Sequence, residues 1–169
     1  MKTTALKKIS LESQPGHAIR RLHQAAVAIF THEIGELGIT PVQYATLQMV
    51  HNHPGFDQRT LARNIALDTS TTAGVVDRLE ARGLLTRNAS PSDRRVRLLS
   101  LTPAGEQLLL DTIPRMEKTQ QLILAPLSPA QQAEFMHLLH LLLNKSPDPS
   151  QMPVDTVSAQ EFSGGMTPV

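Results

Sequence analysis

Residues 57–103 carry the most informative pattern of this 169-residue chain: DQRTLARNIALDTSTTAGVVDRLEARGLLTRNASPSDRRVRLLSLTP. Asp57 can act as the N-cap of a short helix that runs through Ile65, and Asp68 can act as the N-cap of a second helix. Gly83 ends this second helix at a position where a left-handed backbone suits glycine. Two short helices joined by a turn of about three residues predict a helix-turn-helix.

A β-hairpin is predicted directly after these helices. Leu84–Arg87 form a short strand signal, residues 88–93 have the Asn, Ser, Pro and Asp of a turn, and residues 95–101 alternate as the returning strand. A further helix begins at Thr40–Pro41, an N-cap followed by a first-turn proline. Together these elements predict a winged helix-turn-helix at about residues 40–101, which we call the head.

Apolar helices flank the head on both sides. Residues 16–35 have apolar side chains at helical spacing, and residues 103–145 contain two helices with Thr102 and Ser128 as N-caps and Pro114 as a point of bending. The last helix is apolar around most of its circumference, so it is buried either in its own core or against a partner chain. We favour a partner chain, because the first helix is also apolar, and predict a homodimer.

The expected fold class is therefore mainly α with a small β-hairpin: a winged helix-turn-helix head plus a helical dimerisation region. We expect an N-terminal arm at residues 1–15, one domain at 16–145 with dimerisation helices at 16–35 and 103–145, and a tail at 146–169. The tail is rich in Pro and Gly and is expected to be disordered.

Composition excludes several classes of protein. The chain has no Cys, which excludes disulfides and thiolate metal sites and fits a reducing cytoplasm. No apolar run is long enough for a signal peptide or a membrane span. A Gly-rich phosphate loop, a nucleophile elbow and paired catalytic carboxylates are also missing, so we predict that the protein is not an enzyme.

Positive charge is concentrated in the head although the net charge of the chain is only +1. Eight of the eleven arginines, against four acidic residues, lie between positions 59 and 97. A local basic patch is what a phosphate-binding surface requires. The alternative is a solvated face with scattered ion pairs.

The amino-terminal end of the second head helix, TSTTAG at residues 69–74, contains no bulky side chain. Such an end can approach the floor of the DNA major groove, and its hydroxyls and free amides can donate to bases and phosphates. Helix capping is the alternative, but four small or polar residues exceed what a cap requires. The predicted DNA contacts of this segment are Thr69, Ser70, Thr71 and Thr72. Arg78 is either a further DNA contact or the ion-pair partner of Asp77.

Arg94 and Arg95 lie at the tip or shoulder of the predicted hairpin. An arginine held there can enter the narrow minor groove, where the negative potential is enhanced. For each of these arginines, the alternative is an ordinary surface charge.

Three segments together resemble the MarR family of bacterial regulators: residues 77–85 (DRLEARGLL), 90–95 (SPSDRR) and 101–105 (LTPAG). The resemblance covers about residues 16–145. It implies an obligate dimer, with the first and last helices as the interface and a winged head on each side. It also implies that Arg95 is the minor-groove arginine, oriented by Asp93, while Arg94 and Arg97 are phosphate contacts or structural partners.

The resemblance further implies a binding site for a small aromatic carboxylate between the dimer helices and the head. Arginine can bind a carboxylate through two hydrogen bonds, and His or Tyr can bind a ring substituent. The candidates are His17, Arg20, Arg21, His23, Tyr44 and His51. Ordinary surface or core roles are the alternative, although one of the two consecutive arginines is expected to face inward.

Residues 16–26, GHAIRRLHQAA, are similar to the branch of the family that represses nicotinate degradation, which implies a hydroxylated pyridine carboxylate as inducer. We therefore predict a DNA-binding repressor that a small aromatic carboxylate releases, with no other cofactor. The alternatives are a metal-responsive regulator that uses pairs such as His137 and His140, and a winged-helix adaptor that binds proteins.

Overall fold

The computed structural model describes residues 10–93 and 95–145, so most of the predicted arm, Arg94 and the predicted tail lie outside the described residues. In chain order the elements are η1 (Leu11–Ser13), α1 (Pro15–Ile34), η2 (Gly35–Leu37), α2 (Pro41–Asn52), α3 (Gln58–Asn64), α4 (Thr69–Ala81), β1 (Leu85–Ala89), β2 (Arg97–Leu101), α5 (Pro103–Leu124) and α6 (Pro129–Lys145). The predicted fold class, mainly α with one antiparallel hairpin, is confirmed.

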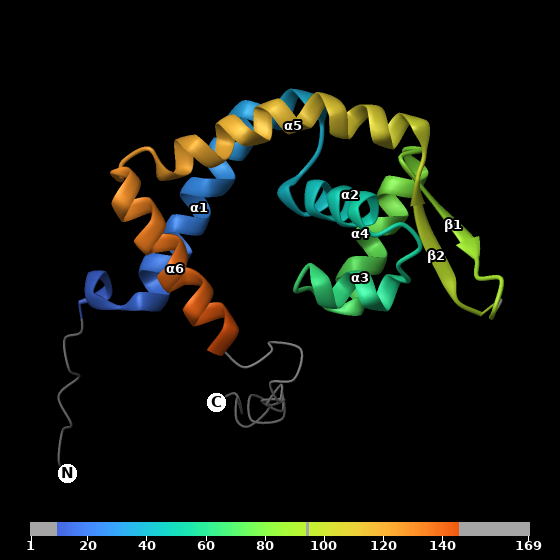
Figure 1. The fold of residues 1–169 in the computed structure, drawn as a ribbon, viewed down its shortest axis with the longest axis horizontal. Helices are drawn as coiled ribbons and strands as arrows, with labels where there is room; N and C mark the ends of the chain where they lie inside the picture. Colours follow the sequence, from blue (N-terminus) through green and yellow to red (C-terminus); the bar gives the residue numbers. More distant parts are fainter. Residues whose placement is uncertain (1–9, 94, 146–169) are drawn as a thin grey trace, which may run out of the picture.

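The long helix α5 joins two parts of the molecule (Figure 1). Its first half lies above the head, which α2, α3, α4 and the hairpin form, and its second half packs on α1. The helix continues through Pro114 without interruption and is gently curved, so the predicted kink is not present. Helix α6 turns away from the end of α5 and lies on the side opposite to the hairpin.

The predicted helix starts are confirmed by their caps. Each N-cap side chain accepts a hydrogen bond from the backbone amide three residues later, and these side chains are Thr40, Asp57, Asp68, Thr102 and Ser128. Gly83 follows α4 with φ +69°, the left-handed conformation expected after the helix.

The hairpin differs from its prediction in length and in its neighbours. Strand β1 continues to Ala89, and β2 begins at Arg97 rather than at residue 95. The reason lies in the loop, where the Ser90 amide donates to the Val96 carbonyl at 2.9 Å and thereby closes the turn beyond the strands. On its other edge β2 pairs with the residues before α3, since the Leu99 amide donates to the Phe56 carbonyl at 2.9 Å.

Two hydrophobic clusters hold these parts together. The larger cluster lies inside the head and is completed by Leu109 of α5. The smaller cluster joins α1 to α5 through Phe30, Ile34, Ile39 and Met116. At the junction of head and α5, Gly105 lies so close to the chain that an added Cβ would be 2.1 Å from the Leu84 carbonyl oxygen.

Helix α6 exposes most of its large apolar side chains. None of its residues is buried, and Leu138 and Leu141 are 47% and 41% exposed. Ile19 and Leu22 of α1 are exposed as well, at 60% and 43%. Among the described residues, no helix is both long and apolar enough to cross a membrane.

Candidate nucleic-acid interface and effector cavity

Asp68 is the N-cap of α4 and holds the amino-terminal end of this helix in place. Its carboxylate accepts hydrogen bonds from the Thr71 hydroxyl at 2.6 Å and the Thr71 amide at 2.8 Å, and these bonds hold the pKa of Asp68 below its usual range. Because the pKa is lowered in the folded protein, the stabilisation is present above the unfolded pKa and is lost as pH falls through the folded value. Thr69, Ser70 and Thr71 are exposed beside this cap. The cap therefore needs no hydroxyl from Thr69 or Ser70.

The structure does not support the predicted role of Thr72. Its side chain is completely buried, and its hydroxyl donates to the Asp68 carbonyl at 2.9 Å. Thr72 shares the inner face of α4 with Val75, Val76 and Leu79, which are buried in the head. A DNA contact from Thr72 is therefore wrong, and the exposed hydroxyls are those of residues 69–71.

Asp77 pairs with Arg87 of β1 rather than with Arg78, and Arg87 also contacts Glu80 at 3.2 Å. Arg78 is exposed and forms no ion pair among the described residues, so of its two predicted roles the pair with Asp77 is wrong. Sequence reasoning missed Arg87, which connects the wing to α4. Its position in β1, opposite two acids one turn apart on α4, becomes visible only once the strand is packed on the helix.

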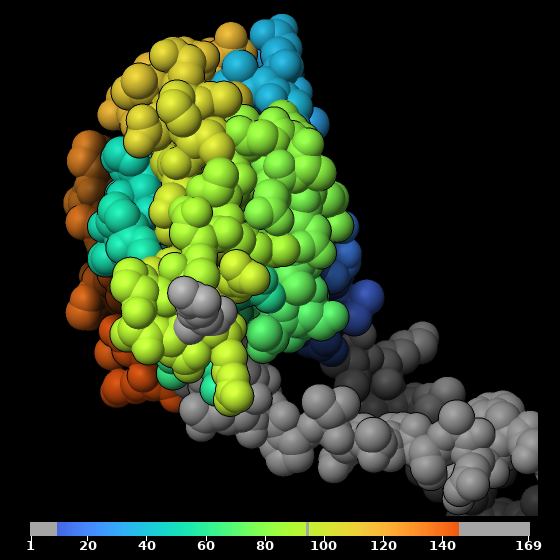
Figure 2. All heavy atoms as spheres, turned by 90° about the vertical axis from the view of Figure 1, so that its right-hand side faces the viewer, coloured from blue at the N-terminus to red at the C-terminus, as the bar shows by residue number. Residues whose placement is uncertain are grey.

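The wing carries exposed arginines. The Asp93 carboxylate accepts the backbone amide of Arg95 at 2.9 Å, so Asp93 fixes the backbone of the loop from which the Arg95 side chain extends. Arg95 and Arg97 are both exposed. Figure 2, which faces the wing, shows α4 and the hairpin as neighbours on one face, in agreement with their direct contacts.

The basic side chains of the head are mostly unpaired. Five arginines are exposed and form no ion pair within residues 10–93 and 95–145: Arg59, Arg63, Arg78, Arg95 and Arg97. These five arginines thus form a solvated surface, and the ion pairs of the alternative do not include them. An uncompensated positive surface attracts polyanions over a distance of about one Debye length, roughly 8–10 Å at physiological salt.

A cavity of about 240 Å³ lies between α1, the start of α2 and the second half of α5. It is lined by His23, Ala26, Val27, Phe30, Pro41, Tyr44, Met116, Thr119, Gln120 and Ile123. The rings of Phe30 and Tyr44 lie 6.5 Å apart at 56°. Burial raises the pKa of Tyr44, and its hydroxyl donates to the Gln48 side-chain oxygen at 3.4 Å. The site is an apolar slot with a few polar groups, as small-molecule sites usually are.

The structure brings together two of the six predicted effector residues, His23 and Tyr44. His17, Arg20 and Arg21 do not line the cavity, and the Arg20 guanidinium donates to the Gln24 side chain at 3.1 Å. Arg20 nevertheless lies one turn before His23 on the same face of α1, while Arg21 lies on another face. The cavity face of α1 therefore continues toward Arg20.

His51 belongs to a different, smaller cavity of about 140 Å³, which it lines with Pro54, Ser100 and Glu106. The prediction that His51 joins the other candidates is wrong, because α2 directs its carboxyl end toward β2 rather than toward α1. In the described part of the chain, no group of three or more His, Asp or Glu side chains could hold a metal ion.

Sequence reasoning missed most of the cavity wall. On α1 the spacing of His23, Val27 and Phe30 is a signal that could have found this face. The α5 residues Met116 and Thr119 gave no such signal, because their place depends on how α5 crosses α1.

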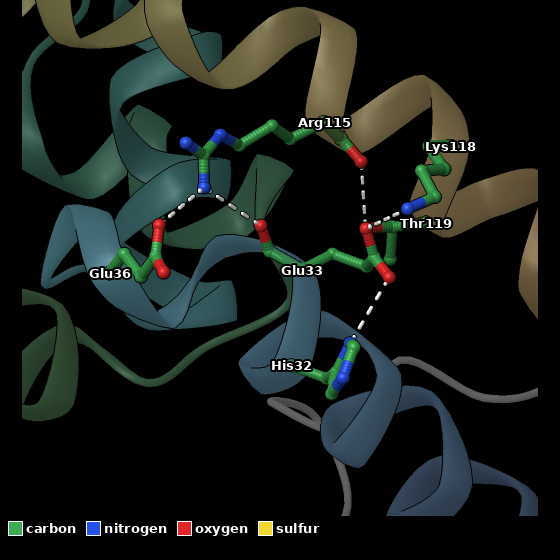
Figure 3. A network of polar contacts seen from close by, with 6 residues as sticks. All are labelled: His32, Glu33, Glu36, Arg115, Lys118 and Thr119. Atoms are coloured by element: carbon green, nitrogen blue, oxygen red, sulfur yellow. Dashed lines mark hydrogen bonds and ion pairs between the residues drawn. The ribbon is translucent and has the colours of Figure 1, made fainter.

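Polar contacts beside the cavity also join α1 to α5 (Figure 3). The Glu33 carboxylate contacts Lys118 at 2.8 Å and His32 at 3.1 Å, and the bond from Lys118 is the main cause that lowers the pKa of Glu33. The Arg115 guanidinium donates to the Glu33 carbonyl at 3.3 Å and to the Glu36 carboxylate at 3.2 Å. These contacts fix the end of α1 on α5.

Comparisons with known proteins agree with this architecture. The model of the MarR family matches residues 39–96. The transcriptional regulator HosA of Escherichia coli O111:H- is 32% identical over 136 residues, which cover 80% of this chain and 99% of HosA. The HTH-type transcriptional repressor NicR of Pseudomonas putida is 30% identical over 131 residues, which cover 78% of this chain and 83% of NicR.

A solved structure is similar over nearly the same range. It is BpsR of Bordetella bronchiseptica, studied for the regulation of its DNA binding by 6-hydroxynicotinic acid. It is 30% identical with a TM-score of 0.78, and the match covers 83% of this chain and 100% of BpsR. These relatives are regulators of transcription or of DNA binding and not enzymes, which agrees with the prediction made from the sequence. The chain therefore belongs to the MarR family and is a transcriptional regulator.

Proposed function

We propose that this regulator is a homodimeric repressor that binds a pseudo-palindromic DNA operator and is released by a small aromatic or pyridine carboxylate, such as a hydroxynicotinate. The observation that carries the DNA-binding part is the exposed, hydroxylated end of α4, capped by Asp68, in a head whose α3, α4 and wing carry exposed arginines without ion pairs.

The end of α4 supplies the groove contact. Thr69, Ser70 and Thr71 are small enough to let the helix end approach base edges, and the exposed hydroxyls of Thr69 and Ser70 can donate to bases or phosphates. Two copies of the head would enter successive major grooves, with half-sites about 34–36 Å apart. This geometry requires a symmetric operator.

The wing supplies a second contact. Arg95 extends from a loop whose backbone Asp93 fixes, so the backbone that presents its guanidinium to the minor groove is ordered before DNA binds. Arg97 and the arginines of α3 would neutralise phosphates on either side. Binding is therefore expected to weaken steeply as salt is raised.

Replacement of Arg95 by alanine is expected to weaken operator binding by about 10- to 100-fold and to reduce the salt slope by about two, one for each wing of the dimer. Fluorescence anisotropy at several salt concentrations, with an operator selected from a random duplex library, measures both quantities. Arg21→Ala removes an equally exposed charge outside the head and should change neither. Unchanged affinity of Arg95→Ala would remove the wing from the interface, and salt-independent retention of DNA by the wild type would favour a protein adaptor.

The cavity supports a single-ring effector. Its volume of about 240 Å³ suits one six-membered ring with two substituents, held between Phe30 and Met116. His23 on the cavity wall and Arg20, one turn earlier on the same helix face, are the candidates to bind a carboxylate, while the Tyr44 hydroxyl can form a hydrogen bond with a ring substituent. The relative BpsR responds to 6-hydroxynicotinic acid, and we extend this class of ligand to the present chain.

His23→Ala and Arg20→Ala are each expected to raise the concentration of 6-hydroxynicotinate that releases half of the operator, by about tenfold or more, because a hydrogen bond to its carboxylate is lost. Operator affinity without ligand should stay within about twofold of wild type. Arg21→Ala is the matched control, since Arg21 lies on another face of α1. If both variants respond like wild type, the carboxylate is bound elsewhere, and if wild type shows no thermal shift with the compound, the ligand class is wrong.

A further inference from the structure

A short connector, residues 35–40, links the cavity helix α1 to the head helix α2. It contains the 3-10 turn Gly35–Leu37, then Gly38 in the left-handed conformation with φ +65°, and then the buried side chain of Ile39. Thr40 ends it with a capping box at the start of α2. Every residue of the connector is thus held in a defined backbone conformation.

The carboxyl end of the connector is in contact with residues that line the cavity. Ile39 packs with Phe30 and Met116, and both of these line the cavity. Directly after the connector, Pro41 and Tyr44 line the cavity as well. A ligand that fills this space must press on the residues that flank the connector, because packed side chains leave little free volume.

One side chain joins the connector to α4, the helix whose amino-terminal end is proposed to contact DNA. Arg82, the C-cap residue of α4, donates from Nη1 to the Gly38 carbonyl at 2.7 Å. Among the side-chain hydrogen bonds of the described residues, this is the one that links α4 to the connector. The opposite end of the same helix is the exposed end at residues 69–71.

A second arginine holds the connector from the dimerisation side. Arg115 of α5 donates to the Glu33 carbonyl and to the Glu36 carboxylate, at the end of α1 and within the connector (Figure 3). Met116 and Thr119, which follow Arg115 on α5, line the cavity. The connector is therefore held between two guanidinium groups. One is Arg115 of α5, and the other is Arg82 at the carboxyl end of α4.

We propose that Arg115 and Arg82 are the positioning residues that couple the cavity to α4. An occupied cavity displaces the connector relative to α5, and Arg82 makes the carboxyl end of α4 follow Gly38, so the orientation of α4 changes. The ligand then favours the head orientation that does not match the operator, which is a shift between two populations. The ligand-dependent test of this proposal rests on the proposed function. In allosteric proteins, an effector typically changes the affinity for the second ligand by about 5- to 150-fold.

The ligand-dependent test uses the full chain, the selected operator and 6-hydroxynicotinate as the probe. The measured quantity is the ratio of the operator Kd with saturating probe to the operator Kd without it, in which a general change of DNA affinity cancels. Wild type is expected to give a ratio of at least about ten, and Arg82→Gln a ratio below about three. Arg82→Lys keeps one donor for the Gly38 carbonyl and should recover part of the ratio, while Arg21→Gln should match wild type.

Two results of this test would overturn the proposal. One is a wild-type ratio in Arg82→Gln. The other is a loss of probe affinity in DNA-free Arg82→Gln, since Arg82 would then act on the cavity itself rather than on the coupling.

A second test needs no ligand and separates this proposal from the proposed function. Hydrogen exchange of the amides at residues 79–83 is measured in wild type, Arg115→Gln, Arg82→Gln and the double variant. Arg115→Gln is expected to raise these rates when Arg82 is present and to add nothing when it is absent. Additive effects, or no effect of Arg115→Gln, would overturn the coupling route. If the probe fails to bind wild type, the ligand class is wrong, while this exchange cycle still decides the role of the two arginines.

Discussion

Replacement of Leu138 and Leu141 by glutamate is expected to convert the protein into a monomer and to weaken operator binding at least about a hundredfold. Both side chains lie one turn apart on α6, are 47% and 41% exposed, and belong to a helix without a single buried residue. A partner chain that covers them would have to bury two unpaired carboxylates, which costs several kcal/mol. A monomer also loses the second head, and linked binding of two sites commonly adds about 10²- to 10⁴-fold.

Sedimentation velocity measures the oligomeric state, and anisotropy with the selected operator measures affinity. The control variant is His137→Glu with His140→Glu, which adds two glutamates at polar positions of the same helix with the same spacing. It should remain dimeric, and circular dichroism should show unchanged helix content in both proteins. A double leucine variant that stays dimeric and binds the operator normally would exclude α6 from the interface.

The second large effect is expected from Gly105→Ala, which should destabilise the fold by about 3 kcal/mol or more. An added Cβ would lie 2.1 Å from the Leu84 carbonyl oxygen, and this oxygen already accepts the Thr102 amide at 3.2 Å. The Thr102 hydroxyl also donates to the Gly83 carbonyl at 2.6 Å. The clash therefore cannot be relieved without separating the start of α5 from the head.

Urea unfolding of the dimer at fixed protein concentration measures this loss, and the melting temperature should fall by roughly 6–12 °C. Gly16→Ala is the matched control, because an added Cβ there meets no atom within 4 Å and alanine favours a helix. Equal stability of Gly105→Ala and wild type would mean that the junction can open without cost.

The sequence predicted those features that local chemistry controls. Caps such as Asp57 and Asp68, and the left-handed Gly83, act within one turn of the chain, so the order of elements and the helix-turn-helix could be read directly. The burial of Thr72 was also present in the pattern, since its spacing to Val75 and Val76 places it on the inner face. The Thr72 hydroxyl is compatible with this buried position because it donates to the Asp68 carbonyl within the same helix.

Features that depend on packing between distant segments could not be predicted. Arg87 meets Asp77 only after β1 has packed on α4, and Arg82 meets Gly38 across 44 positions of the chain. The cavity likewise depends on the crossing of α1 and α5, which brings Met116 and Thr119 beside His23. Single-sequence periodicity identifies the face of each helix but not the partner of that face.

The cap at Asp68 has a consequence for how such a regulator can acquire new targets. The Asp68 carboxylate caps α4 through the Thr71 amide and hydroxyl, and the exposed side chains of Thr69 and Ser70 take no part in these hydrogen bonds. Exchange of these two side chains can therefore alter the preferred base sequence while the domain stays folded. Fold stability and the choice of DNA target thus depend on neighbouring but separate positions. Paralogues can diverge in the promoters that they recognise, and the same two positions are suited to engineered changes of DNA specificity.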